Sequence, residues 1–132
     1  MSEQPPRASE LPETILVVED ADTIRELVAT VLRSMNFIVL EAATASEALS
    51  MAEGATAPDL LLSDIQLPGM SGLELAHVLT ELFPQLPVIL MTAFTLESSA
   101  ATSIWPILQK PFTAKQLIDA IQGVLHPEMS TD

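Results

Sequence analysis

The chain has 132 residues, a length that suits one domain, and 48% of them are hydrophobic, enough to form a core at this size. It has no cysteine, which excludes disulfides, zinc–thiolate sites and thiol nucleophiles. Five basic residues stand against 18 acidic ones, for a formal charge of −13. Because nucleic-acid binding needs a cationic surface, direct binding of DNA or RNA is not expected.

The two ends of the chain are predicted to be flexible tails. Residues 1–13 are polar and proline-containing, and residues 127–132 are similar. The first segment lacks the apolar stretch of a signal peptide. No apolar run approaches the roughly 20 residues that a membrane helix needs. We therefore expect a cytoplasmic protein that does not contact the membrane.

Between the tails, short apolar runs alternate with segments of helical periodicity. The runs predict strands at residues 14–18, 37–40, 60–63, 87–91 and 107–109. They are continuous rather than alternating, so both faces of the sheet must be covered by helices. Strand and helix follow each other along the whole chain, and right-handed crossovers then give an α/β fold with an open, doubly wound parallel sheet of five strands.

Helix boundaries are marked by capping residues. Asp22 is expected to cap the first helix, and Asn36 to end it. Three later helices are expected to open with capping boxes, at Thr44-x-x-Glu47, Ser71-x-x-Glu74 and Thr113-x-x-Gln116.

The end of the third strand carries the strongest chemical signal. Residues 60–63 are predicted to be buried on both faces, Asp64 follows them, and a loop built on Pro68 and Gly69 comes next. A carboxylate at the tip of a buried strand is unfavourable unless water, a metal or a partner charge meets it. Ligands of open parallel sheets bind at the carboxyl ends of strands. We interpret Asp64 as the reactive group.

Other polar residues follow the remaining strands: Glu19 and Asp20 the first, Thr92 the fourth and Lys110 the fifth. If the first and third strands are neighbours, three carboxylates converge, and Mg²⁺ prefers such oxygen ligands. The hydroxyl and the ammonium suit a phosphoryl group on Asp64. An aspartate can be the covalent acceptor of a phosphoryl group.

With these residues, the chain resembles the receiver domain of two-component response regulators over about residues 14–125. Four motifs carry the resemblance in order, each at a strand end: Ile15-Leu16-Val17-Val18-Glu19-Asp20, Asp59-Leu60-Leu61-Leu62-Ser63-Asp64 with Pro68-Gly69-Met70-Ser71-Gly72, Met91-Thr92-Ala93, and Gln109-Lys110-Pro111-Phe112. The resemblance implies a flavodoxin-like strand order of 2-1-3-4-5 and a receiver domain over residues 14–126.

The resemblance also implies roles for the site residues. Asp64 would accept the phosphoryl group of a histidine kinase or a histidine phosphotransfer protein. Thr92 would move to bond that group, and Lys110 would pair with it. The Lys110–Pro111 peptide bond is expected to be cis. Mg²⁺ would be held by Glu19, Asp20, Asp64 and the backbone carbonyl of Gln66.

Two features depart from the family pattern. Ile107 stands three residues before the lysine, where the family usually carries an aromatic residue that swings inward when the threonine moves. Trp105 is nearby, but we interpret it as a packing residue. Residues 93–104 leave room only for a short or irregular fourth helix, as in receivers of hybrid kinases and receivers that stand alone.

The sequence therefore favours a phosphorylation-dependent switch that signals by protein contact or phosphorelay. We expect no enzymatic activity beyond its own phosphorylation and dephosphorylation, and no output domain after the last helix. One alternative is a receiver-like interaction module that never uses phosphate. Another is an aspartate-nucleophile phosphatase of the haloacid-dehalogenase type, because Asp20-Ala21-Asp22 resembles the opening motif of that class. Its nucleophile would have to lie on the first strand, and the chain offers no cap segment for a substrate.

Overall fold

The structure is a computed structural model that describes residues 12–54, 57–93 and 104–126. Of the tails predicted from the sequence, residues 1–11 and 127–132 lie outside the described residues. The segment predicted to hold a short or irregular fourth helix also lies outside them, except for its two ends. Among the helices of the described ranges, none is long and apolar enough to cross a membrane.

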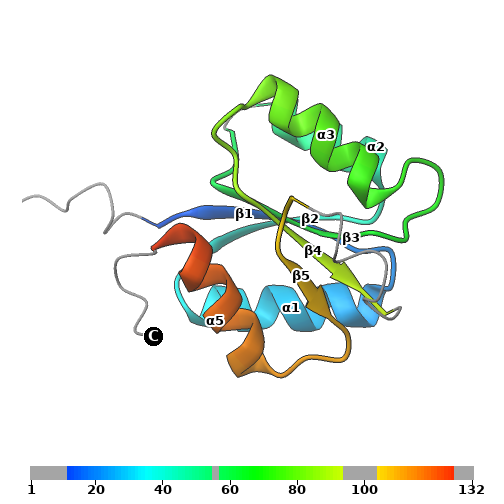
Figure 1. Ribbon diagram of the computed structural model, residues 1–132. Coiled ribbons are helices and arrows are strands. Elements are labelled where there is room, and N and C mark those ends of the chain that lie inside the picture. Colours follow the sequence, from blue (N-terminus) through cyan, green and yellow to red (C-terminus); the bar gives the residue numbers. More distant parts are fainter. Residues whose placement is uncertain (1–11, 55–56, 94–103, 127–132) are drawn as a thin grey trace, which may run out of the picture.

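Five parallel strands form one sheet in the order β2-β1-β3-β4-β5, which confirms the predicted fold class and strand order. The strands are β1 Thr14–Val18, β2 Ile38–Ala42, β3 Leu60–Asp64, β4 Val88–Thr92 and β5 Ile107–Gln109. The helices are α1 Asp22–Ser34, α2 Ala45–Glu53, α3 Gly72–Leu82 and α5 Ala114–Leu125. Figure 1 shows α2 and α3 on one face of the sheet and α1 and α5 on the other.

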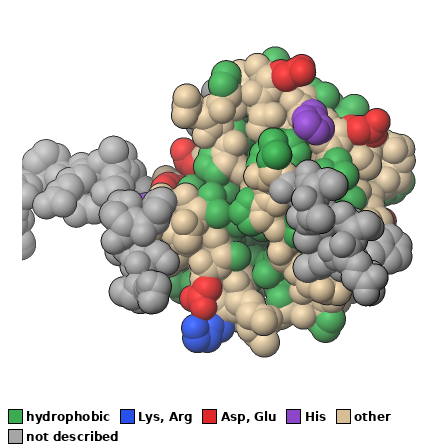
Figure 2. All heavy atoms as spheres, in the orientation of Figure 1, with side chains coloured by type: hydrophobic (Ala, Val, Ile, Leu, Met, Phe, Trp, Pro, Cys, Tyr) green, Lys and Arg blue, Asp and Glu red, His purple; other side chains and the backbone are tan. Residues whose placement is uncertain are grey.

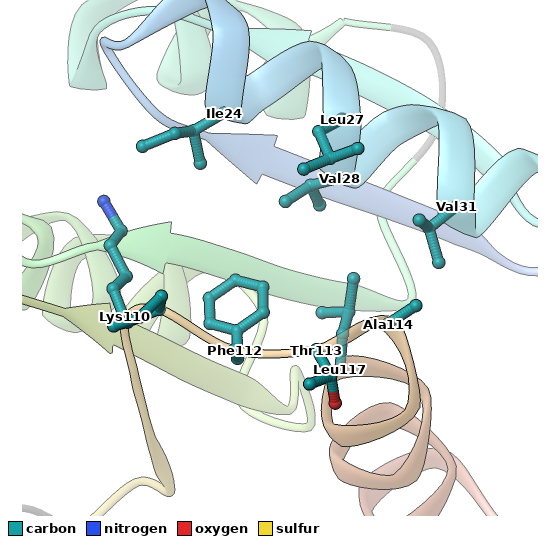
Figure 3. A pocket seen from close by; sticks show the side chains of 10 residues that line it. Ile24, Leu27, Val28, Val31, Lys110, Phe112, Thr113, Ala114 and Leu117 are labelled. Carbon is teal, nitrogen blue, oxygen red and sulfur yellow. The ribbon is translucent and has the colours of Figure 1, made fainter.

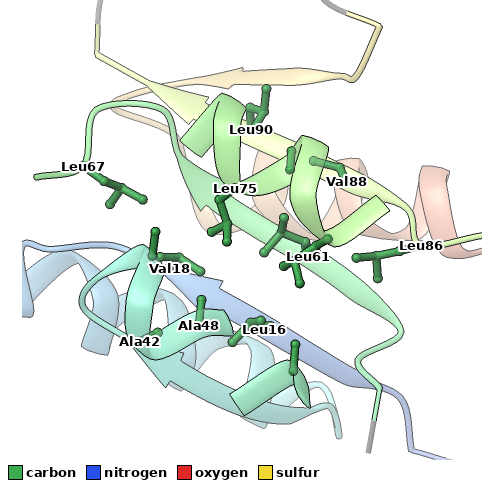
Figure 4. Close-up of a cluster of buried hydrophobic side chains, with 14 residues drawn as sticks. Leu16, Val18, Ala42, Ala48, Leu61, Leu67, Leu75, Leu86, Val88 and Leu90 are labelled. Atoms are coloured by element: carbon green, nitrogen blue, oxygen red, sulfur yellow. The ribbon is translucent and has the colours of Figure 1, made fainter. Parts of the chain in front are cut away.

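Strand β1, which lies between β2 and β3, shows why the apolar runs are continuous. Its residues Ile15 and Val17 belong to the core cluster under α1 and α5. Leu16 and Val18 belong to the cluster under α2 and α3, which Figure 4 shows from close by. All four are fully buried. A strand covered on both faces needs an apolar side chain at every position, because successive side chains point to opposite faces.

The helix starts largely follow the predicted capping boxes. Complete boxes open α3 at Ser71 and α5 at Thr113. At α2, the hydroxyl of Thr44 accepts the backbone N–H of Glu47 at 3.0 Å. The carboxylate of Glu47 instead accepts the N–H of Ala43 at 2.7 Å, one residue before the position that a capping box predicts.

The prediction that Asp22 caps α1 is wrong. The N-cap residue is Ala21, which makes no side-chain cap bond, and Asp22 is the first helical residue. Its carboxylate accepts Nη2 of Arg25 at 2.7 Å, and an acidic side chain in the first turn also interacts favourably with the helix dipole. Asn36 follows the end of α1 in a left-handed conformation, with φ 75°, as its predicted helix-ending role requires.

Charge is unevenly distributed over the molecule. No Lys or Arg occurs in the sequence between Arg33 and Lys110. Figure 2 shows acidic side chains scattered over one face of the molecule, whereas basic side chains are visible only at its lower edge. The layer formed by α2 and α3 therefore offers no cationic surface to a polyanion.

Candidate functional site

The predicted site residues meet at the carboxyl edge of the sheet, because β1, β3 and β4 are neighbours. Asp64 is the last residue of β3 and pairs with Met91 of β4. Thr92 ends β4, and Glu19 directly follows β1, where its N–H donates to the carbonyl of Ala42 at 3.0 Å. Parallel strands bring residues that are far apart in the sequence to one edge.

Three carboxylates converge at this edge. Each of Glu19, Asp20 and Asp64 offers an oxygen, and these oxygens lie within 4.8 Å of one another. Glu19 and Asp64 are buried, whereas Asp20 is exposed and opens the cluster to solvent. Carboxylate oxygens that repel one another and retain access to water are a donor set that fits a hard divalent cation. The residues present therefore fit the metal that the resemblance implies.

Lys110 provides the compensating positive charge. Its Nζ lies 2.7 Å from Oε1 of Glu19 and 2.8 Å from Oδ2 of Asp64. Burial lowers the pKa of the Lys110 ammonium, but the bonds to Asp64 and Glu19 outweigh burial and raise this pKa overall. Burial raises the pKa of Glu19, and the bond from Lys110 only partly offsets this rise. Lys110 is therefore firmly cationic next to two acids.

Both oxygens of the Asp64 carboxylate have hydrogen-bond partners. Oδ2 accepts Nζ of Lys110, and Oδ1 accepts the backbone N–H of Gln66 at 3.0 Å. The carboxylate is thus held in one orientation at the end of β3, while its solvent exposure is only 4%. A fixed and largely desolvated carboxylate is preorganised for attack on an electrophile brought to the edge.

Thr92 and the end of β5 complete the site. The buried Thr92 hydroxyl donates to Oε1 of Gln66 at 3.3 Å. The backbone N–H of Lys110 donates to the carbonyl of Thr92 at 2.8 Å, which fixes the end of β5 beside β4. The Lys110–Pro111 peptide bond is cis, as the resemblance implies. All six predicted site residues are therefore brought to one edge of the sheet.

Two residues of the site were not singled out from the sequence. Arg25 donates from Nη1 to the carbonyl of Glu19 at 2.8 Å and so supports the acidic loop from α1. Gly72 begins α3 against the backbone of Asp64, where a Cβ atom would lie 2.0 Å from the Asp64 carbonyl oxygen. The sequence does mark Gly72, because this glycine lies in one of the motifs that carry the resemblance to receiver domains. The sequence does not mark the bond from Arg25 to Glu19, because it indicates only the (i, i+3) pair of Arg25 with Asp22.

The strand-five neighbourhood shows what stands in place of the usual aromatic residue. Ile107 is half-buried and packs against the core cluster under α2 and α3. Trp105 packs against the same cluster, in line with its interpretation as a packing residue. Its ring meets the ring of His77 edge-on, with centroids 4.9 Å apart and planes at 65°. Trp105 therefore connects the start of β5 to α3.

An apolar groove of about 260 Å³ lies beside the site, between α1 and the start of α5. Figure 3 shows Ile24, Leu27 and Val31 of α1 facing Phe112 and Leu117 across it, with the ammonium of Lys110 at one end. The groove is lined by Ile24, Leu27, Val28, Val31, Lys110, Pro111, Phe112, Thr113, Ala114 and Leu117.

Known proteins of similar sequence include a transcriptional regulatory protein and a sensor kinase. The phosphate regulon transcriptional regulatory protein PhoB of Pseudomonas aeruginosa is 35% identical over 118 residues, which cover 85% of this chain and 51% of PhoB. The sensor kinase CckA of Brucella abortus is 32% identical over 120 residues, which cover 87% of this chain and 13% of the kinase. The chain thus spans about half the length of PhoB and a small part of CckA.

Solved structures show the same fold. A response regulator receiver domain protein from Methanospirillum hungatei has a TM-score of 0.80 at 30% identity, covering 90% of this chain and 98% of its own. The receiver domain of the hybrid histidine kinase CckA has a TM-score of 0.73 at 33% identity, covering 86% of this chain and 99% of its own. The family model for the response regulator receiver domain matches residues 15–122. The chain belongs to the response regulator receiver domain family.

Proposed function

We propose that this receiver domain, over residues 14–126, is a signalling switch that accepts a phosphoryl group on Asp64. The donor would be a histidine kinase or a histidine phosphotransfer protein. The observation that carries the proposal is the buried Asp64 carboxylate, held by Gln66 and Lys110 beside the acidic oxygens of Glu19 and Asp20. Its only chemistry would be its own phosphorylation and the hydrolysis of the resulting acyl phosphate.

The transfer follows from the charges in the site. A carboxylate oxygen of Asp64 attacks phosphorus, the bond from phosphorus to the donor nitrogen breaks, and the electron pair of that bond leaves with the imidazole. Lys110 pairs with the phosphoryl oxygens, and Thr92 donates its hydroxyl proton to one of them. Mg²⁺ bound by Glu19, Asp20, Asp64 and the Gln66 carbonyl would neutralise the charge on the phosphoryl group.

The apolar groove suits the docking of the phosphodonor. Lys110 lines the groove and also bonds Asp64, so a protein seated there reaches the acceptor carboxylate directly. Leu27 of α1 is 64% exposed although Val28 and Ala29, which follow it, are buried, and this leaves an apolar contact for a partner. The occupant we propose is an amphipathic helix of the donor, which would bring its phosphohistidine to the edge of the sheet.

We propose output by protein contact or by phosphorelay to another histidine protein in the cytoplasm, without contact to the membrane. Direct binding of nucleic acid is not part of the proposal, because no basic residue occurs between Arg33 and Lys110. The two named relatives, one called a transcriptional regulatory protein and one called a sensor kinase, illustrate the settings in which such a domain is found.

A mass measurement tests the proposal. The protein is incubated with Mg²⁺ and a small phosphodonor such as phosphoramidate, and the expected result is a gain of one phosphoryl group that Asp64→Asn abolishes. Asp59→Asn is the matched control, because Asp59 directly precedes β3 at the end opposite Asp64 and accepts the N–H of Thr14 at 2.7 Å. No gain with any donor would sink the proposal. A gain that survives Asp64→Asn but not Asp20→Ala would favour the phosphatase alternative.

A further inference from the structure

Gln66 contacts both the acceptor carboxylate and the threonine. Its backbone N–H donates to Oδ1 of Asp64 at 3.0 Å, and its side-chain Oε1 accepts the hydroxyl of Thr92 at 3.3 Å. Gln66 lies in the loop after β3 with its residue surface exposed, whereas Thr92 is only 2% exposed. An exposed side chain therefore bonds a buried hydroxyl beside the reactive group.

The contact holds the Thr92 hydroxyl toward the loop after β3. At 3.3 Å it is longer than the roughly 2.7–2.8 Å of most O–H···O bonds, so it is weak and can be exchanged readily. A hydroxyl has one proton to donate. The Thr92 hydroxyl therefore cannot donate to Gln66 and to a phosphoryl oxygen on Asp64 at the same time.

We propose that Gln66 is a positioning residue. Its carboxamide holds Thr92 in the resting orientation and competes with the phosphoryl group for the hydroxyl proton of Thr92. This inference rests on the proposed function, since it assumes that Asp64 takes the phosphoryl group. A ligand shifts a conformational equilibrium only by its differential interaction with the two states. Removal of the Gln66 acceptor lowers the free energy needed to leave the resting state, so phosphoryl binding becomes tighter.

The test compares wild type with Gln66→Met, which keeps the side-chain length and removes the oxygen. Affinity for beryllofluoride in the presence of Mg²⁺ is measured, since this anion mimics the phosphoryl group. We expect about two- to tenfold tighter binding by Gln66→Met, the factor that one net hydrogen bond corresponds to. Trp105 is the one tryptophan of the chain and gives an intrinsic fluorescence signal for the titration.

A double-mutant cycle separates this role from a general effect on the loop. In a Thr92→Val background the hydroxyl is gone, so Gln66→Met is expected to leave the beryllofluoride affinity unchanged. An equal gain in both backgrounds would overturn the inference. Gln85→Met is the matched control, because Gln85 is an exposed glutamine in the turn after α3, and it is expected to behave as wild type.

A second measurement does not depend on phosphate. The rotamer of Thr92 is determined by NMR from couplings to its methyl group in the metal-free protein. We expect the rotamer that donates to Gln66 to dominate in wild type and to lose population in Gln66→Met. If both proteins show the same single rotamer, the inference is wrong. If the rotamers differ but wild type binds no beryllofluoride, the Gln66 role is supported and the proposed function fails.

Discussion

The Nζ atom of Lys110 lies 2.7 Å from Oε1 of Glu19, although the two residues are 91 positions apart in the sequence. Glu19 is 1% exposed, so its carboxylate depends on this bond for charge compensation. The same carboxylate is a proposed ligand of Mg²⁺. A cation bound there would compensate the same acidic cluster as Lys110, so the loss of one would increase the importance of the other.

Replacement of Lys110 by methionine is the direct test of this relationship. We expect Lys110→Met to lower the unfolding free energy of the metal-free protein by about 2–4 kcal/mol, because it leaves uncompensated buried charge. Addition of Mg²⁺ is expected to raise the melting temperature of Lys110→Met by more than that of wild type. Denaturation with EDTA and with Mg²⁺ measures both effects.

Lys115→Met is the matched control. Lys115 forms an ion pair with Asp119 at 2.8 Å, but both side chains are largely exposed. Such exposed pairs contribute little to stability, because water and salt screen the two charges. A loss of stability in Lys110→Met no larger than in Lys115→Met would show that the buried lysine does not compensate the acidic cluster.

The stability of the metal-free protein should depend on pH through Glu19. Burial raises the pKa of Glu19 above its ordinary value of 4.5, and the bond from Lys110 does not fully offset this. A group whose pKa is higher in the folded protein favours folding in its protonated form. This gain in unfolding free energy is fully present below pH 4.5 and is lost as the pH rises through the raised pKa of Glu19. Glu19→Gln stays neutral, so its stability relative to wild type should increase over that range. Denaturation curves from about pH 4.5 to about pH 8 measure the difference, and a constant difference contradicts the prediction.

The fold was predictable because burial on both faces leaves a simple pattern in the sequence. The continuous apolar runs predicted every strand, and the glycine, proline and capping residues placed most helix ends. The start of α1 was missed by one residue. Ala21 adopts the extended N-cap conformation, with φ −81° and ψ 112°, and makes no side-chain bond. A residue without a capping side chain gives no signal in the sequence.

The meeting of the predicted site residues at one edge of the sheet was predictable, but their bonds were not. Position at a strand end placed Lys110 near Asp64, yet the sequence does not show that the ammonium also bonds Glu19. The contact between Gln66 and Thr92 depends on the path of the loop after β3, which no local pattern specifies. Long-range bonds of this kind follow from tertiary geometry, so they become visible only in the folded chain.

Gly72 is expected to tolerate no side chain. A Cβ atom there would lie 2.0 Å from the carbonyl oxygen of Asp64, which is backbone and cannot move aside without displacing the acceptor. We expect Gly72→Ala to destabilise the protein by about 2 kcal/mol or more and to slow phosphorylation by phosphoramidate. Chemical denaturation and the mass assay measure the two effects.

Gly123→Ala is the matched control for Gly72→Ala. Gly123 lies within α5, and a Cβ atom there would meet nothing within 4 Å. Since alanine is the better helix former, this substitution is expected to stabilise the protein by about 0.5–1 kcal/mol. If both glycine variants change stability in the same direction, close packing against Asp64 is not the reason for Gly72.

Arg25 is expected to set the geometry of the acidic loop. Its Nη1 donates to the Glu19 carbonyl at 2.8 Å, and its Nε lies 3.5 Å from the carboxylate of Glu41. We expect Arg25→Met to weaken Mg²⁺ binding about two- to tenfold, because the Glu19 backbone loses one charge-assisted hydrogen bond. Arg33→Met is the control, since Arg33 also pairs with Glu41, at 3.0 Å, and is not observed to bond Glu19. Titration with Mg²⁺ by fluorescence measures both variants. Equal weakening would mean that Arg25 acts through general charge rather than through its bond to the loop.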